Sequence, residues 1–268
     1  MKKQDKQPDW GTLAEKFDLW VPHIAPVGDA LLAALDAQSD DLILDLASGT
    51  GEPALTLAKK QQGATIIGTD AAAGMVRVAE KKAQQQRLKN IQFQTMAAEA
   101  LSFPDNHFDR ISCRFGVMLF DDSEVGLQQM HRVLKPGGRC VLAVWNTIEE
   151  MTTVFWSQQV FKKRISESEQ PAVDAITSMS GPVLENLLKK VGFSEVSTQI
   201  NHFEYSFPSF DAYWKNCMDS EIMKKQFDAL QTGQLKEVKN AFAELAKPYQ
   251  TDNGLRIPHK YQLAVATK

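Results

Sequence analysis

The stretch LILDLASGTGEPALTLAKK, residues 42–60, constrains the fold more than any other part of the sequence. A short aliphatic run ends in an acid, a glycine-rich corner follows, and a helical pattern starts at once. This order predicts a buried strand, a tight loop and a helix, the first part of a βαβ unit. Parallel sheets bind ligands outside the carboxyl ends of their strands, so the loop is expected to lie at a binding edge.

Further aliphatic segments continue the alternation of strands and helices. Strands are expected at 64–70, 91–95, 108–114 and 139–145, with helices at about 54–60, 72–88 and 123–134. The sequence KPGG, with Pro136 and Gly137, has the chemistry of a turn before the fifth strand. Two later strands are expected within SEVSTQINHFEYSF and in a short closing segment, KYQLAVATK. We therefore predict an α/β fold with a doubly wound, mainly parallel, seven-stranded, Rossmann-like sheet.

The remaining segments are predicted to be helical additions to this sheet. Two helical patterns fall within residues 1–38, and we expect them to form a cap over the sheet. Pro22 and Pro26 separate the two helices, because neither proline suits a helix interior. Residues 39–268 would form the sheet domain. After the fifth strand, a lid or insertion is expected around 147–182 and a helical elaboration around 209–246.

The composition and charge exclude several classes of protein. The formal net charge of −3 and the absence of a basic stripe argue against a nucleic-acid partner. No apolar run approaches the roughly 18 residues of a spanning helix, so no stable membrane insertion is expected. Three widely spaced cysteines without a CxxC pair indicate buried thiols in a reducing compartment. The N-terminal MKKQDKQPDW has no apolar segment typical of a signal peptide. These features predict a cytoplasmic protein.

The glycine corner fits two classes of ligand. Residues 49–54 read GTGEPA and match G-x-G-x-x-A, and Asp70 follows Gly51 by 19 residues, the distance of a ribose contact in dinucleotide-binding folds. Asp45, however, would repel a pyrophosphate and suits a cationic amino-acid group. Glu52 places a side-chain charge at the helix N-terminus, where a phosphate would bind. Together with the forty-residue cap, these details favour S-adenosylmethionine, a nucleoside that carries a positively charged amino acid.

The sequence resembles a known family along residues 40–146. LILDLASGTG, IIGTD, AEALSFPDNHFD, CRFGVMLFDD and RVLKPGGR match, in order and spacing, the class I S-adenosylmethionine-dependent methyltransferases. The ubiquinone- and menaquinone-biosynthesis-like small-molecule enzymes are the most similar group. The resemblance implies a methyltransferase with S-adenosyl-L-methionine as methyl donor and a small-molecule acceptor.

The resemblance also implies donor contacts at matching positions. Asp45 would reach the methionine amino group, and Asp70 would take both ribose hydroxyls. Glycines and small residues would let the backbone approach the donor, and other residues would border the adenine or the sulfonium. The full set is Asp45, Ala47, Gly49, Gly51, Asp70, Ala71, Met75, Ala98, Glu99, Arg114 and Phe115.

Several of these residues have ordinary structural alternatives. Asp70 would serve equally as a helix N-cap, and Met75 as part of the core. Glu99 could equally be a solvated surface acid, and Arg114 could equally form a structural ion pair. The family usually carries an aspartate where this chain has Ala97, so one hydrogen bond to the adenine amine is missing or comes from another group.

The catalytic residue cannot be assigned from the sequence. Methyl transfer from a sulfonium needs alignment and desolvation, and a base only when the acceptor carries a proton. The five histidines show no metal spacing, and the fifth strand ends in Trp145–Asn146 instead of the Asp–Asn pair of magnesium-assisted enzymes, so no metal is expected. Tryptophans in and around the cap favour an apolar or aromatic acceptor. An NAD(P)-binding oxidoreductase and a non-catalytic donor-binding protein are the alternatives.

Overall fold

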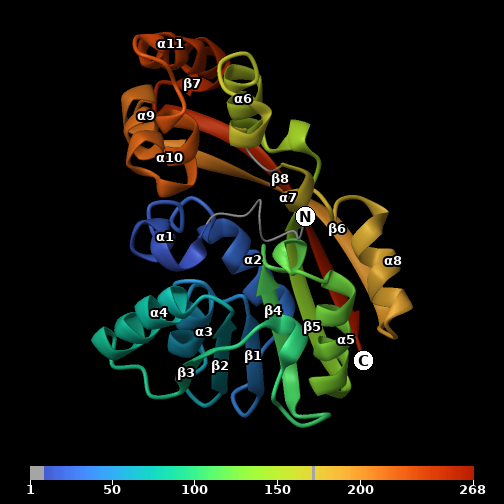
Figure 1. Cartoon of the computed structure of the whole chain (residues 1–268). Coiled ribbons are helices and arrows are strands. Elements are labelled where there is room, and N and C mark those ends of the chain that lie inside the picture. The colour runs from blue at the N-terminus through green and yellow to red at the C-terminus, as the bar shows by residue number, and fades with distance from the viewer. Residues whose placement is uncertain (1–8, 171–172) are drawn as a thin grey trace.

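The computed structural model describes residues 9–170 and 173–268, which form a twisted sheet covered by helices (Figure 1). The strand order is β3-β2-β1-β4-β5-β8-β6, and a two-residue strand β7 pairs with β8. The strands are β1 (Leu42–Leu46), β2 (Thr65–Asp70), β3 (Ile91–Thr95), β4 (Phe108–Arg114), β5 (Leu134–Trp145), β6 (Ser194–Phe207), β7 (Gln250–Thr251) and β8 (Gly254–Thr267). Strands β1 to β5 pair in parallel, whereas β8 is antiparallel to β5, β6 and β7. This confirms the predicted α/β fold with a mainly parallel sheet.

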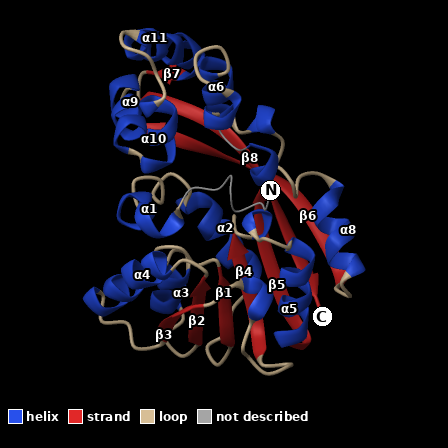
Figure 2. Ribbon diagram, in the orientation of Figure 1, coloured by secondary structure: helices blue, strands red, loops and turns tan. Residues whose placement is uncertain are grey.

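Helices cover both faces of the sheet and form a separate group beyond one end of it (Figure 2). The helices are α1 (Trp10–Phe17), α2 (Ala25–Leu35), α3 (Ala54–Lys60), α4 (Ala73–Gln85), α5 (Ser123–Val133), α6 (Thr152–Phe161), α7 (Val173–Ile176), α8 (Pro182–Lys190), α9 (Phe210–Asp219), α10 (Glu221–Asp228) and α11 (Gln234–Ala246). None of these described helices has the length and apolar character needed to cross a bilayer.

The strand order reverses between β1 and β4, which fixes the binding edge. The chain passes from β1 to β2 and β3 on one side, then returns to β4 and β5 on the other. The register pairs Asp45 with Ser112 and Asp70 with Thr95, so the ends of these strands lie at one edge. Ligands of open α/β sheets bind at such a reversal. The fold therefore brings the glycine corner and Asp70 to one place.

Strands β6 and β8 form a long antiparallel arm that runs past the sheet toward α6, α9, α10 and α11 (Figure 1). The predicted short closing strand is wrong in length, because β8 spans 14 residues. The aromatic alternation expected in β6 is confirmed: Phe203, Tyr205 and Phe207 are buried. The arm thus turns an aromatic face toward the cap and the carboxyl edge of the sheet.

Two expectations about prolines and turns need correction. Pro26 does not separate the cap helices but lies in the first turn of α2, where its missing N–H removes no helical hydrogen bond. Strand β5 begins at Leu134 and not after the KPGG turn. Gly137 still makes the turn expected there, with φ 75°. The cap boundary at residue 38 remains a prediction.

Candidate active site

The loop after β1 has the tight backbone that the glycine pattern predicts. Ala47, Gly49 and Gly51 have φ values of 51°, 54° and 104°, in the left-handed region. A Cβ added at Gly51 would lie 2.7 Å from the Leu55 side chain. The loop therefore needs glycine for conformation and for close packing on the start of α3.

Asp45 is a buried acid with one unused oxygen. Its Oδ1 accepts a 2.5 Å hydrogen bond from the Ser112 hydroxyl. Its Oδ2 is fully buried and has no hydrogen-bond partner among the described residues. The side chain is 1% exposed, and burial raises its pKa to about 7. A buried carboxylate oxygen without a partner is costly, and a cationic group of a ligand would satisfy it.

Asp70 joins the two loops at the edge of the sheet. One carboxylate oxygen accepts from the Gly49 backbone N–H and the other from the Ala72 N–H, each at 2.9 Å. Burial raises the pKa of this carboxyl. Ala72, and not Asp70, is the N-cap residue of α4. Asp70 is therefore not the simple helix cap considered above, while the adjacent Ala71 is exposed.

The residues predicted to contact the adenine lie at the start of α4 and in a short 3₁₀ helix after β3. Met75, in the first turn of α4, is 2% exposed, and Ala98 begins a short 3₁₀ helix and is 6% exposed. The Glu99 carboxylate accepts from the Asp122 backbone N–H at 3.2 Å. Glu99 is therefore tied to the start of α5 and is not simply a solvated surface acid.

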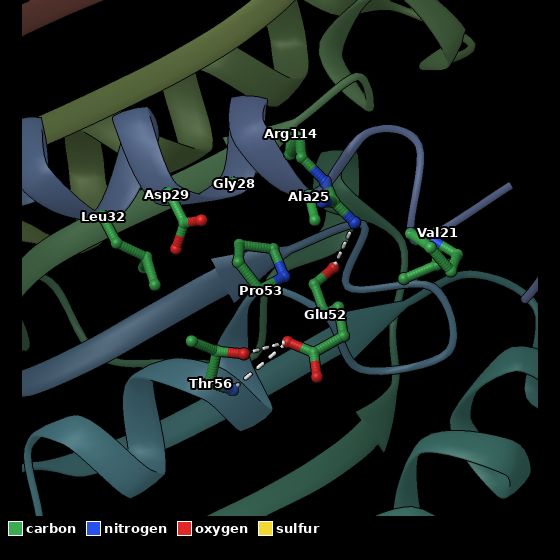
Figure 3. A pocket seen from close by; sticks show the side chains of 10 residues that line it. Val21, Ala25, Gly28, Asp29, Leu32, Glu52, Pro53, Thr56 and Arg114 are labelled. Carbon is green, nitrogen blue, oxygen red and sulfur yellow. Dashed lines mark hydrogen bonds between the residues drawn. The ribbon is translucent and has the colours of Figure 1, made fainter. Parts of the chain in front are cut away.

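Arg114 connects the cap with the glycine corner. Its Nη1 donates to the Ile24 carbonyl oxygen at 3.2 Å and its Nη2 to the Glu52 carbonyl oxygen at 2.8 Å (Figure 3). Burial lowers the pKa of its guanidinium. No carboxylate of the described chain lies within ion-pairing distance, so the proposed structural ion pair is absent from residues 9–170 and 173–268. A largely buried cation without an ion-pair partner suits an anionic group of a ligand.

Glu52 and a neighbouring cavity complete this side of the corner. The Glu52 carboxylate accepts two hydrogen bonds from Thr56: one from the Thr56 hydroxyl at 2.7 Å and one from the Thr56 backbone N–H at 3.2 Å. The expected charge at the start of α3 is thus present, and it lies where a dinucleotide phosphate would bind. A half-open cavity of about 210 Å³ separates α2 from this corner, with Pro53 on its wall and Arg114 at its end (Figure 3).

Phe115 directly follows Arg114 at the end of β4, and its ring stacks on that of Trp145. Its φ is 60°, a left-handed conformation that is strained for a bulky residue. Its ring stacks on Trp145 with centroids 3.9 Å apart and planes inclined by 9°. This stack covers the edge of the sheet where β4 and β5 end. It gives the site one flat apolar wall.

The cap is fastened over the glycine corner by contacts that the sequence did not predict. The Asp18 carboxylate accepts from the Thr50 hydroxyl and from the Lys82 ammonium, each at 2.6 Å. The Trp20 indole N–H donates to the Ser220 hydroxyl at 2.7 Å. No local pattern marks these residues, since they lie tens to hundreds of positions apart. They close the cap onto both the sheet domain and the helices beyond it.

An aromatic group on the β6–β8 arm also escaped the sequence analysis. The Tyr205 ring stacks on His259 at 4.0 Å and contacts His23 of the cap at 5.5 Å. The His23 ring lies 4.2 Å from that of Phe207. The alternation in β6 was visible in the sequence, but its pairing with His259 was not. Within the part of the chain described, no three His, Cys, Asp or Glu side chains are grouped to hold a metal.

Comparison with known proteins agrees with the predicted family. A methyltransferase domain family matches residues 43–138. A demethylmenaquinone methyltransferase of Bacteroides fragilis is 33% identical over 215 residues, covering 69% of this chain and 87% of that protein. An uncharacterized protein of Mycobacterium tuberculosis is 34% identical over 274 residues, covering 97% of this chain and 91% of that protein.

Solved structures support the fold. The YcgJ protein of Bacillus subtilis superposes with a TM-score of 0.61 at 20% identity, covering 91% of this chain and 98% of that one. Phosphoethanolamine N-methyltransferase 2 of Haemonchus contortus, in complex with S-adenosyl-L-methionine, has a TM-score of 0.57 at 18% identity, covering 91% of this chain and 52% of that one. The chain belongs to the class I S-adenosylmethionine-dependent methyltransferases.

Proposed function

We propose that this methyltransferase acts on a small, apolar or aromatic molecule bound between the cap and the β6–β8 arm. The observation that carries the proposal is the aromatic face of Tyr205, Phe207 and Phe203, which meets the cap beside the end of β4. Flat apolar walls with few polar groups favour ligands of this kind. The B. fragilis relative is named for demethylmenaquinone, a molecule with a flat quinone ring.

The amino-acid end of the donor would lie between Asp45 and Arg114. The fit rests on two charges of opposite sign: the buried, unused Oδ2 of Asp45 and the partly buried guanidinium of Arg114, which lacks an ion-pair partner among the described residues. They are close enough for the Arg114 charge to lower the pKa of Asp45 against the larger effect of burial. Such a pair suits the ammonium and the carboxylate of methionine.

The remaining predicted residues would hold the nucleoside. The small residues Ala47, Gly49 and Gly51 line the loop that the ribose would approach, and Asp70 would accept its hydroxyls. Both Asp70 oxygens already accept one backbone N–H, and each retains capacity for a second hydrogen bond. The adenine would lie among Ala71, Met75, Ala98 and Glu99, with Phe115 toward the sulfonium.

The protein's contribution to the reaction would be alignment and exclusion of water. The bound donor supplies a methyl group already activated by the positive sulfur. The Asp18 contacts would keep the described part of the cap, residues 9–38, closed over the glycine corner, whereas residues 1–8 of the predicted cap lie outside the described residues. A lid within 147–182 remains a proposal; its first part, α6, buries Trp156 and Phe161 and is therefore anchored. Glu52 at the start of α3 disfavours the oxidoreductase alternative.

A screen of acceptors tests the proposal. The protein would be incubated with S-adenosylmethionine and panels of quinols, phenols, amines and polar metabolites, with mass-spectrometric detection of a methyl gain. We expect turnover on flat aromatic acceptors in reduced form. Exclusive turnover on highly charged or polymeric acceptors, including RNA, would contradict the proposal while leaving methyl transfer intact.

Replacement of Asp70 is expected to weaken donor binding. Asp70→Ala removes the acceptor of the ribose hydroxyls and should cost about 1.5–3 kcal/mol, the range for hydrogen bonds to a charged group. Asp70→Asn retains one acceptor oxygen for the loop and should cost less. Calorimetry with S-adenosylmethionine and its demethylated product measures both. Equal donor affinity in wild type and Asp70→Ala would refute the ribose assignment.

The adenine loop offers a test in the opposite direction. Ala97→Asp restores the acid usual in the family and should tighten donor binding by about 0.5–1.5 kcal/mol, the net contribution of one hydrogen bond. Glu99→Ala should cost a similar amount only if Glu99 serves the adenine amine as well as the Asp122 N–H. If Ala97→Asp weakens binding and Glu99→Ala has no effect, the adenine lies elsewhere.

A further inference from the structure

Strand β6 forms one edge of the sheet, and its outer side is unpaired in the described chain (Figure 1). Within residues 9–170 and 173–268, β6 pairs with β8 alone. Half of its backbone N–H and C=O groups therefore point away from the sheet. Helices α8 and α9 each pack on both β6 and β8, so they lie over the faces of this pair of strands and not along its outer side.

The edge lacks features that usually prevent a free strand from pairing with another chain. Natural edge strands are commonly protected by lysine, by proline or by a bulge. Residues 194–207, SEVSTQINHFEYSF, contain no lysine, arginine, proline or glycine. A register shift lies between Ser194 and Ser197, and beyond it the pairing with β8 is regular up to Phe207. A regular and unprotected edge of this length can accept a further strand.

An exposed apolar pair lies near the middle of this edge. Ile200 is 50% exposed, and Val183 at the start of α8 is 45% exposed. They are the two most exposed large hydrophobic side chains of the described residues. Gln262, the β8 partner of Ile200, donates to the Gly181 carbonyl oxygen at 3.0 Å. This hydrogen bond holds the start of α8 next to Ile200, so both side chains belong to one part of the surface.

Charged groups of opposite sign lie on the same face of the strand, at the two ends of this region. The Glu185 carboxylate of α8 accepts from the Thr198 hydroxyl at 3.1 Å. Lys189, one helical turn further along α8, donates to Glu185 at 2.5 Å and is 56% exposed. Glu204 of β6 is exposed and has no ion-pair partner among the described residues. Because side chains alternate along a strand, Glu204 projects from the face that α8 covers at Thr198.

We propose that two copies of this chain associate through their β6 edges as an antiparallel pair, with a two-fold axis at Ile200. The two sheets would then join into one. Ile200 would meet its counterpart across the axis, beside Val183 of each copy, and the exposed apolar surface would be buried. A symmetric contact of this kind uses the same residues twice. The association does not depend on which acceptor the enzyme methylates.

The charges explain why the second strand would come from another copy of this chain. In the proposed register, positions equally far from Ile200 on either side face each other. Glu204 of one copy would lie opposite Val196 of the other. Since α8 runs antiparallel to β6, Lys189 lies near Val196, and its ammonium would meet the incoming carboxylate. This contact forms twice in the dimer and supplies Glu204 with the partner that it lacks within its own chain.

Other registers fit less well. Centring on Ile200 places the exposed His202 opposite Thr198, which is a polar pair without like charges. Centring on Glu204 would place two carboxylates directly opposite each other, which is destabilising. Centring on Thr198 would extend the new ladder into residues 194–197, where the strand is irregular. The axis at Ile200 therefore combines regular backbone with complementary side chains.

Sedimentation equilibrium and light scattering over a hundredfold range of protein concentration test the association. We expect a reversible dimer with twice the chain mass of 29.9 kDa. Ile200→Lys should weaken the dimer at least about 100-fold, because it removes the central apolar contact and places two ammonium groups opposite each other. The matched control Leu235→Lys changes a side chain of α11 that is 42% exposed, and it should leave the dimer unchanged. Both variants should bind the donor as wild type does.

Two further measurements test the register. Glu204→Lys should weaken the dimer about tenfold, and combining it with Lys189→Glu should restore the dimer. Ile200→Cys should form a disulfide across the axis under mild oxidation, because directly opposite Cβ atoms lie about 4.5–5.5 Å apart. His202→Cys should not, since its two copies would lie about 13 Å apart along the strands. Native Cys113, Cys140 and Cys217 are buried.

Each other outcome overturns the proposal or part of it. A chain that stays monomeric over the whole concentration range overturns the association. A dimer that Ile200→Lys leaves intact uses a different surface and overturns it as well. If Ile200→Lys dissociates the dimer but Ile200→Cys does not crosslink, the axis at Ile200 is wrong. Binding of a different protein at Ile200 to an otherwise monomeric chain would rule out the second copy as occupant. Should Ile200→Lys fold poorly, failure of the Glu204–Lys189 charge exchange to restore the dimer decides against the proposed register.

Discussion

Donor binding is expected to weaken about a hundredfold between pH 8 and pH 5, because Asp45 must be ionised to hold the methionine ammonium. Burial raises the pKa of its carboxyl to about 7, and its Oδ2 has no other partner among the described residues. At pH 8 most molecules carry the carboxylate, whereas each unit below the pKa removes about nine-tenths of the remaining ionised fraction. The donor's own α-ammonium has an ordinary pKa of about 7.7–8.0, so it is charged below pH 7 and loses about half of its charge by pH 8, which offsets the gain from Asp45 there by about twofold.

Calorimetry across pH 5 to 8.5, in two buffers of different ionisation enthalpy, measures this effect. Near pH 7 binding should release a fraction of a proton, because the bound ammonium lowers the Asp45 pKa. Asp45→Asn should bind the donor weakly at every pH, with a free energy of binding about 2–5 kcal/mol less favourable than that of the ionised wild type. It should also lose most of the pH dependence. Burial raises the pKa of Asp70 as well, so a small residual slope in the variant would report that group.

A flat affinity profile in the wild type, or a steep one in Asp45→Asn, would contradict this account. The first result would show that Asp45 does not contact the ammonium in its charged form. The second would assign the pH dependence to another group. Retained folding of Asp45→Asn can be checked by thermal unfolding, since asparagine can still accept the Ser112 hydroxyl.

The sheet and the glycine corner were predictable because their signals are local. An aliphatic strand, a glycine loop and a helix follow one another within residues 42–60, and the structure has β1, the corner and α3 there. Asp45 and Asp70 needed only one further rule, that parallel strands end at a common edge. The sequence thereby placed Asp45 and Asp70 at one edge of the sheet without any knowledge of long-range contacts; their contacts with the donor remain a prediction.

The arm was not predictable, for a physical reason that involves Pro258. The closing strand predicted from the sequence starts only at Lys260, two residues after Pro258, and a proline is disfavoured inside a strand that is paired on both sides. In the structure β8 begins at Gly254, and β5 pairs with it only from Tyr261 onward. Pro258 is therefore paired with a long strand on one side only, where it lies opposite Glu204 of β6. No ladder hydrogen bond from a Pro258 N–H to β5 is needed. Tyr205 and Phe207, the aromatic partners of His23 in the cap, lie on this arm, so the sequence alone does not reveal these contacts.

The contacts that fasten the cap depend on tertiary structure in the same way. Asp18, Thr50 and Lys82 show no mutual pattern, and only folding places their side chains together. Ser112 resembles an ordinary strand residue until its hydroxyl meets Asp45. Local propensity cannot reveal such pairs, because each residue alone is unremarkable in its helix, strand or loop.

Replacement of Arg114 is the second large effect that we expect, since this side chain would serve the donor and the cap together. Arg114→Ala should weaken donor binding by about 2–5 kcal/mol, the cost of removing one partner from a buried, hydrogen-bonded charge pair. It also leaves the Ile24 and Glu52 carbonyl oxygens without their donor. The loop between α1 and α2 should therefore become more sensitive to protease, which limited proteolysis measures alongside calorimetry.

Two further variants separate charge from geometry. Arg114→Lys keeps the positive charge but lacks the planar fork that reaches two carbonyl oxygens, so donor affinity should be largely retained while the cap loop is cleaved faster. Arg110→Ala removes a partly buried cation near the other end of β4, where it lies 3.4 Å from Asp41. That control should lower stability without changing donor affinity. If Arg114→Ala binds donor as wild type does but loses cap protection, Arg114 only fastens the cap, and the donor carboxylate must find its partner elsewhere. If both properties fall in Arg114→Ala and only cap protection falls in Arg114→Lys, one guanidinium couples donor binding to closure of the cap over the glycine corner.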